Sequence, residues 1–90
     1  MRFTWDSGKA DFNFRKHGIS FHEATTAFRD PLSIMGYDPD HSIGEDRFVT
    51  FGMSNKNRLV VVSHKEEGEV IRLISCRLAT KQEHQIYEQA

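Results

Sequence analysis

Three arginines and one histidine in the second half of the chain are the side chains best suited to chemistry on a phosphate. Arg72 and Arg77 lie in an apolar, β-branched run, and Arg47 precedes an earlier run of the same kind. The planar fork of arginine donates two hydrogen bonds to phosphate oxygens and stays charged. His64 could move a proton, because imidazole titrates near neutrality. Metal-free phosphoryl transfer needs both functions, since a base must deprotonate the attacking hydroxyl while cations stabilise the phosphate.

Each of these residues also has a plainer interpretation. An arginine on a strand beside glutamates often forms only a surface ion pair, which contributes little energy. A histidine at the end of a strand is often an ordinary surface residue. The pair Arg47 and His64 becomes a candidate site only if the strands bring the two side chains together.

The C-terminal segment offers a second set of contacts for RNA. Thr80 and Glu83 have the spacing of a capping box, which predicts the start of a helix. Tyr87 follows one turn later and is expected to pack on the core. Alternatively, Glu83 and Tyr87 could flank an RNA base, with Lys81 as a further RNA-binding residue.

A metal site is not predicted. Asp38, Asp40 and His41 lie close together in the sequence, but they have no fourth ligand at a recognisable spacing and match no calcium-loop pattern. An acidic loop is the ordinary explanation, so the phosphate would have to be held by protein side chains.

The periodicity of apolar residues, capping signals and turn residues predict an α+β domain over residues 1–90. Its single antiparallel sheet, an N-terminal strand plus a three-stranded meander, would carry two N-terminal helices and one C-terminal helix. In order, we expect a strand over Arg2–Trp5, a helix from Asp6 or Ser7 to about His17, a helix that starts at Ser20 and stops before Asp30-Pro31, a weak edge strand over 32–35, strands over Phe48–Met53, Leu59–His64 and Val70–Cys76, and a helix from Lys81 to about Glu88.

The hairpin turns determine which polar residues face each other. A turn centred on Asn55 and Lys56 places Arg47 opposite His64. The second hairpin leaves two registers open, with either Ser63 or His64 opposite Arg72. Arg72 and Arg77 are separated by an odd number of residues, so they share a face only if the strand ends or bulges between them.

The composition of the chain excludes several classes of protein. The net charge is -1, so attraction to nucleic acid has to be local, and no apolar run is long enough to span a bilayer. The single cysteine, Cys76, lies in an apolar strand, where a buried and unreactive thiol is expected. We therefore expect a soluble cytoplasmic protein that contacts no membrane.

Residues distributed over nearly the whole chain resemble the BrnT toxins of bacterial type II toxin–antitoxin systems. The combination of Lys16-His17-Gly18 with the C-terminal spacing of arginine, serine, arginine and Ala-Thr is the most specific part. The matching residues are Trp5-Asp6, Lys9, Asn13, Lys16-His17-Gly18, Phe21, Glu23-Ala24, Asp30-Pro31, Asp46-Arg47, Gly52, Val62, His64, Glu66, Ile71-Arg72, Ile74-Ser75, Arg77, Ala79-Thr80, Glu83 and Tyr87. Cys76 stands where alanine is usual, and Lys65 where threonine is common.

This resemblance implies a small RelE-like ribonuclease that needs no cofactor. Such a toxin cuts cellular RNA, free or on the ribosome, and arrests translation. Its implied partner is a BrnA-like antitoxin with a ribbon-helix-helix segment, through which alone the complex would contact operator DNA. Two alternatives remain open from the residues themselves: a module that binds RNA or the ribosome without cutting, and an interaction protein whose apolar surface docks a partner helix.

Overall fold

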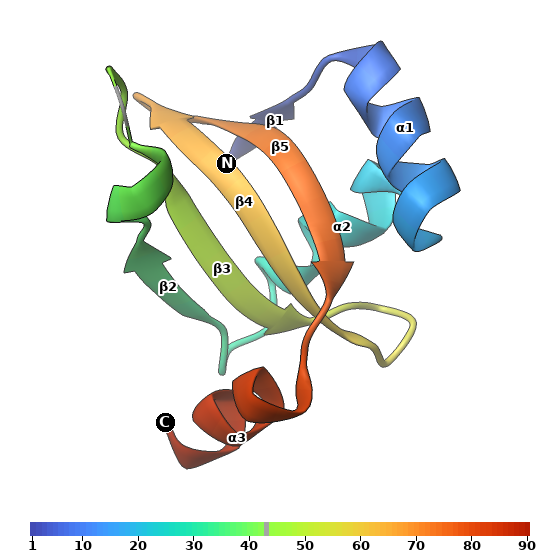
Figure 1. The fold of residues 1–90 in the computed structure, drawn as a ribbon, viewed down its shortest axis with the longest axis vertical. Coiled ribbons are helices and arrows are strands. Elements are labelled where there is room, and N and C mark those ends of the chain that lie inside the picture. The colour runs from blue at the N-terminus through green and yellow to red at the C-terminus, as the bar shows by residue number, and fades with distance from the viewer. Residues whose placement is uncertain (43) are drawn as a thin grey trace.

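The computed structural model describes residues 1–42 and 44–90 and shows one mixed sheet with helices α1 and α2 packed against it (Figure 1). The elements are β1 (Arg2–Thr4), α1 (Ser7–His17), α2 (Phe21–Ala27), β2 (Ile34–Tyr37), the 3-10 helix η1 (Pro39–His41), β3 (Phe48–Met53), β4 (Leu59–Glu67), β5 (Val70–Leu78) and α3 (Lys81–Gln89). The strand order is β1-β5-β4-β3-β2. No helix in the described ranges has the length and apolar character needed to cross a membrane.

The prediction of a purely antiparallel sheet is wrong at one edge. The meander of β3, β4 and β5 and the edge strand β2 are antiparallel as expected, but β1 pairs in parallel with β5. Parallel neighbours require a long crossover, and here residues 5–69 separate the two strands. A strand of three residues is too short for its alternating pattern to predict which strand it pairs with, or whether the pairing is parallel or antiparallel.

Capping residues explain where all three helices begin and where α1 ends, as the sequence predicts, whereas α2 ends at Ala27, before the predicted stop at Asp30-Pro31. The Asp6 carboxylate accepts a hydrogen bond from the Lys9 N–H at 2.9 Å, which starts α1. Gly18 ends α1 with φ of +71°, a left-handed conformation that favours glycine. Thr80 and Glu83 form both hydrogen bonds of the capping box at α3.

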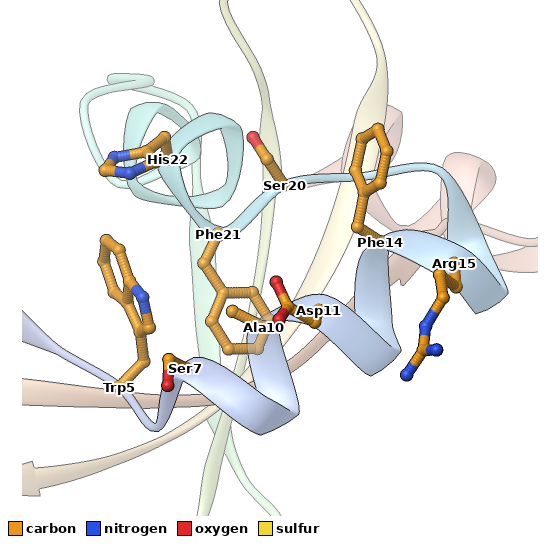
Figure 2. A pocket seen from close by; sticks show the side chains of 9 residues that line it. All are labelled: Trp5, Ser7, Ala10, Asp11, Phe14, Arg15, Ser20, Phe21 and His22. Atoms are coloured by element: carbon orange, nitrogen blue, oxygen red, sulfur yellow. The ribbon is translucent and has the colours of Figure 1, made fainter.

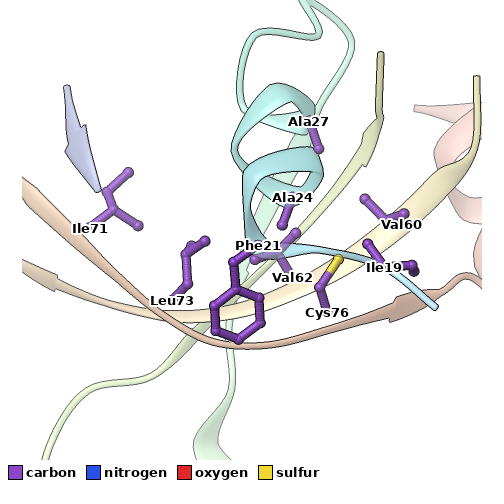
Figure 3. Packing of buried hydrophobic residues seen from close by; sticks show 9 residues of the cluster. All are labelled: Ile19, Phe21, Ala24, Ala27, Val60, Val62, Ile71, Leu73 and Cys76. Carbon is purple, nitrogen blue, oxygen red and sulfur yellow. The ribbon is translucent and has the colours of Figure 1, made fainter. Parts of the chain in front are cut away.

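The core fills the space between α2 and the sheet (Figure 3). Its buried members are Ile19, Phe21, Ala24, Ala27, Val60, Val62, Ile71, Leu73 and Cys76. Cys76 is completely buried, as expected, and this burial raises the pKa of its thiol to about 12.

Asn13 joins α1 to β5 through its buried amide. Its side chain donates to the carbonyls of Ile19 and Cys76 at 3.0 and 2.9 Å, and accepts from the Cys76 N–H at 2.9 Å. Because β1 ends at Thr4, opposite Arg72, it does not reach this part of β5. The Asn13 amide supplies the backbone partners that a longer strand would provide.

The predicted pairing of Arg47 with His64 is wrong, because the first hairpin is one residue longer than expected. Phe48 lies opposite His64, and a shift of one residue sends Arg47 and His64 to opposite faces of the sheet. His64 is completely buried between the rings of Phe28 and Phe48, and its Nε2 lies 2.8 Å from Thr50 Oγ1. It therefore leaves the proposed catalytic cluster.

The buried His64 should make the stability of the fold depend on pH. Burial lowers its pKa from 6.5 to about 4, and Nδ1 has no hydrogen-bond partner among the described residues. Between these two values the unfolded chain binds a proton that the folded chain does not. The free energy of unfolding should therefore have its full value above pH 6.5 and fall by roughly 3 kcal/mol as the pH drops to about 4.

Urea denaturation at several pH values checks this prediction, with His64→Gln as the variant that cannot titrate. The variant should lose the part of the pH dependence that lies between pH 6.5 and 4. If the unfolding free energy of the two proteins changes equally with pH in this range, a neutral, buried His64 is contradicted.

Candidate functional site

A hollow of about 300 Å³ lies on the face of the sheet opposite α1 and α2, here called the open face. Along β4, the buried side chains of Val60, Val62 and His64 point into the core, so Val61 and Ser63 point to the open face. We call this cavity the arginine hollow. Its lining residues are Asp38, His41, Arg47, Val49, Val61, Ser63, Ile74, Ser75 and Arg77.

A bulge in the pairing of β4 with β5 turns Arg72 and Arg77 to the same face. Ser63 pairs with Ser75 and His64 pairs with Leu73, which leaves Ile74 as an extra residue. This is the break near Ser75 that the odd spacing of the two arginines requires. The second hairpin has neither register expected from the sequence, since Arg72 lies opposite Lys65.

The bulge gathers only one of these two arginines into the arginine hollow. Arg77 lines it, near the end of β5, whereas Arg72 lies nearer the start of the strand and is not among the lining residues. Arg72 instead pairs with Lys65 on β4 and with Thr4 on β1. Arg72 and Lys65 form a second cationic pair farther along the same face.

Arg77 is held in place by a bidentate ion pair with Glu83. Its Nη1 and Nη2 atoms donate to the two carboxylate oxygens of Glu83 at 2.7 and 2.9 Å. These hydrogen bonds lower the pKa of Glu83 to about 2 and raise the pKa of Arg77. Glu83 is thus both the capping-box residue of α3 and the group that orients the guanidinium.

The remaining donors of Arg77 point away from this ion pair. Nη1 uses its second hydrogen on the carbonyl of Leu78, at 3.3 Å. The Nε–H and the second Nη2–H form the other edge of the planar fork, and no described residue accepts from them. That edge can hold two phosphate oxygens while Glu83 still holds the first edge.

Arg47 enters the arginine hollow from the segment that leads into β3. Its Nε donates to Glu45 at 3.2 Å, and the other oxygen of Glu45 accepts from Lys65 at 2.8 Å. The hydrogen bond from Lys65 is the main reason that the pKa of Glu45 is lowered. Glu45 therefore lies between two cations of the open face, Arg47 and Lys65, and binds both.

Lys81, Glu83 and Tyr87, the predicted RNA contacts, lie on α3 beyond the ends of β3 and β5 (Figure 1). Tyr87 donates a hydrogen bond to the Asp30 carboxylate, which raises the pKa of Tyr87 to about 12. Together with the Arg77–Glu83 ion pair, this bond ties α3 to the rest of the fold. Glu83 and Tyr87 thus have partners within the chain, and a contact of this set with RNA stays a prediction.

The sequence did not identify four of the polar residues of the arginine hollow as parts of one site. Ser63 and Ser75 are directly opposed on β4 and β5, and Asp38 and His41 come from η1 and the residue before it. In the sequence, Asp38 and His41 belong only to an incomplete metal motif. A histidine three residues after an aspartate is too common a spacing to identify a functional site without the structure.

A larger hollow, of about 560 Å³, lies between α1 and α2 on the other side of the molecule (Figure 2). The rings of Trp5, Phe14 and Phe21 form much of its wall, and its only ion-pairing groups are Asp11, Arg15 and His22 among the described residues. It has one arginine where the arginine hollow has two. We therefore place phosphate chemistry in the smaller cavity.

Comparisons with known proteins agree on one family. The family model described as "Ribonuclease toxin, BrnT, of type II toxin-antitoxin system" matches residues 5–83. Among solved structures, the ribonuclease toxin BrnT of Brucella abortus is 32% identical, covers 90% of this chain and 99% of its own, and superposes with a TM-score of 0.66. No curated protein matches the chain.

Proposed function

This chain belongs to the BrnT family of ribonuclease toxins of type II toxin–antitoxin systems, and we propose that it is an endoribonuclease that cleaves RNA without a metal ion and inhibits translation. The arginine hollow is the observation that supports this assignment. It presents Arg47 and Arg77 together with the hydroxyls of Ser63 and Ser75 on an accessible face. We further propose that the fold is a variant of the RelE-like ribonuclease fold.

The two arginines suit the transition state of phosphodiester cleavage. Attack by the 2′-hydroxyl places additional negative charge on the non-bridging oxygens, and cations already fixed in place stabilise that charge without reorganising. Glu83 fixes Arg77, and Glu45 contacts Arg47. The free edge of Arg77 then binds the phosphate in a bidentate manner.

Metal independence is proposed because of the groups that line the cavity. Two guanidinium groups take the role that a metal ion has in other nucleases, and Asp38 is the only carboxylate in the lining among the described residues. Within residues 1–42 and 44–90, no group of three or more His, Cys, Asp or Glu side chains is arranged to hold a metal ion. Cleavage by the purified protein should continue in the presence of EDTA.

We propose a BrnA-like antitoxin as the partner, with operator DNA contacted only through it. The net charge of -1 gives the toxin no general attraction for DNA, while the cationic open face provides local attraction for RNA. The proposed place of action is the cytoplasm, on cellular RNA that includes translated messages.

Expression of this chain alone in bacteria should stop growth, because RNA cleavage without an inhibitor depletes messages. Co-expression with the antitoxin encoded beside it should restore growth. The measurement is growth together with primer-extension mapping of cellular RNA, at soluble expression verified by immunoblot. Normal growth at that level would contradict the toxin assignment.

A module that binds RNA or the ribosome without cutting gives a different result. In that case growth would stop, but RNA incubated with stoichiometric pure protein and ribosomes would stay intact. New RNA ends in this experiment favour the endoribonuclease.

A further inference from the structure

We propose that His41, oriented by Asp38, is the general base that deprotonates the 2′-hydroxyl of RNA in the arginine hollow. This inference rests on the proposed ribonuclease function. It assigns the proton transfer that His64 cannot perform, because His64 is completely buried on the other face of the sheet.

The contact between His41 and Asp38 defines which ring nitrogen acts. Nδ1 of His41 lies 2.8 Å from Oδ2 of Asp38, and a carboxylate accepts, so Nδ1 carries the hydrogen. The neutral ring then has its lone pair on Nε2, which is the atom that can take a proton. The His41 side chain is 68% exposed and the Asp38 side chain is 21% exposed, so the base is accessible while the group that orients it is largely covered.

Ser42 fixes this pair relative to Arg47. The Ser42 hydroxyl donates to the carbonyl of Asp38 and accepts from the Arg47 N–H at 2.9 Å. The Asp38 N–H donates to the Arg47 carbonyl at 2.8 Å. The base, the group that orients it and a phosphate-binding cation are therefore tied together through one segment.

The other histidines of the chain lie elsewhere. His17 ends α1, His22 is in α2 beside Trp5, and His84 is in α3. Among the described residues that line the arginine hollow, His41 is the only side chain whose type ordinarily exchanges protons near neutral pH. This makes it the group best matched to general-base catalysis there.

The proposed step balances as an internal transesterification. Nε2 of His41 takes the proton of the 2′-hydroxyl, and the 2′-oxygen forms a bond to phosphorus. The bond from phosphorus to the 5′-oxygen breaks, and this oxygen takes a proton from a water molecule. The hydroxide that remains is neutralised by the proton that His41 then releases, which restores the neutral base. The products are a 2′,3′-cyclic phosphate and a 5′-hydroxyl, while Arg47 and Arg77 stabilise the phosphate between them.

The first test is the cleavage of a short RNA by purified His41→Ala. We expect kcat to fall by about 10²- to 10⁴-fold, the usual contribution of general-base catalysis. Binding of the same oligonucleotide with a 2′-deoxy residue at the cleavage position should stay within about threefold of the native value, since P–O chemistry and not affinity is lost. Free imidazole should restore part of the rate, because it can enter the exposed space that the ring leaves.

His84→Gln is the matched control, since His84 lies on α3 outside the arginine hollow, and it should cleave at the native rate. Asp38→Asn tests the positioning role, because asparagine donates to Nδ1 and favours the wrong tautomer. It should lower kcat by about tenfold to a thousandfold and leave KM nearly unchanged. In the His41→Ala background and without imidazole, Asp38→Asn should cause little further loss, because Asp38 acts through His41.

The outcomes separate this inference from the proposed function. Native protein that leaves RNA uncut overturns the ribonuclease proposal and the inference with it. Native protein that cuts, with His41→Ala cutting equally fast, overturns only the inference. A slow His41→Ala that imidazole does not accelerate, or products that end in a 3′-hydroxyl, also overturns it.

Discussion

Replacement of Arg77 or Arg47 by alanine is expected to abolish toxicity while the protein still folds and binds its antitoxin. Each arginine lines the arginine hollow, and the loss of one charge-assisted donor to the transition state costs roughly 3 kcal/mol, on the order of a hundredfold in rate. The measurements are growth after induction and the cleavage rate of purified protein, with circular dichroism to verify the fold.

Lysine variants separate geometry from charge. Arg77→Lys should rescue cleavage poorly, because an ammonium group cannot use one edge for Glu83 and the other for phosphate. Arg2→Ala is the matched control, since Arg2 lies exposed on β1 and outside the arginine hollow, and it should stay toxic. If both alanine variants remain toxic at equal soluble levels, Arg47 and Arg77 are only surface ion pairs.

Arg72 should behave differently from Arg77, although the sequence assigned them the same role. It shares the open face but lies beside Lys65 and outside the arginine hollow. We expect Arg72→Ala to weaken RNA binding and its salt dependence more than the rate of the chemical step. Cleavage rates at saturating RNA and binding at two salt concentrations distinguish these effects.

Gly52→Ala is expected to cause the largest loss of stability among single methyl additions at glycine. A Cβ atom on Gly52 would lie 2.5 Å from the carbonyl oxygen of Ala27, so β3 and α2 would have to separate. Overpacking of this kind costs about 1 to 3 kcal/mol, and the entropy gained on replacing glycine offsets less than about 1 kcal/mol of that. The melting temperature should fall by roughly 5 to 15 °C.

Gly36→Ala is the matched control on the neighbouring strand β2. Apart from its chain neighbours, no described heavy atom lies within 4 Å of the position that the added methyl group would take, and its backbone does not require glycine. The stability of this variant should stay within about 0.5 kcal/mol of the native value. Equal melting temperatures for the two variants would show that α2 is not packed tightly on β3.

Local interactions made the secondary structure predictable. The two limits of α1 and the start of α3 follow from residues within four positions of each end, namely Asp6, Gly18 and the Thr80–Glu83 capping box. The edge strand was expected over 32–35 and lies at Ile34–Tyr37, because its few apolar residues define its position only weakly. The burial of Cys76 was also predictable, since it follows from its place in an apolar strand.

The sequence by itself indicated the family, the order of the main strands and helices, and three candidate cations, Arg47, Arg72 and Arg77, of which only Arg47 and Arg77 line the arginine hollow. The tertiary structure alone decided which side chains meet. The length of one hairpin placed His64 on the core face of the sheet, and one bulge turned Arg72 and Arg77 to the same face. The tertiary structure also brought Asp38 and His41 to the same cavity as Arg47 and Arg77. In a sheet, a change of one residue in register reverses the face of every side chain, and neither apolar periodicity nor turn composition fixes that count.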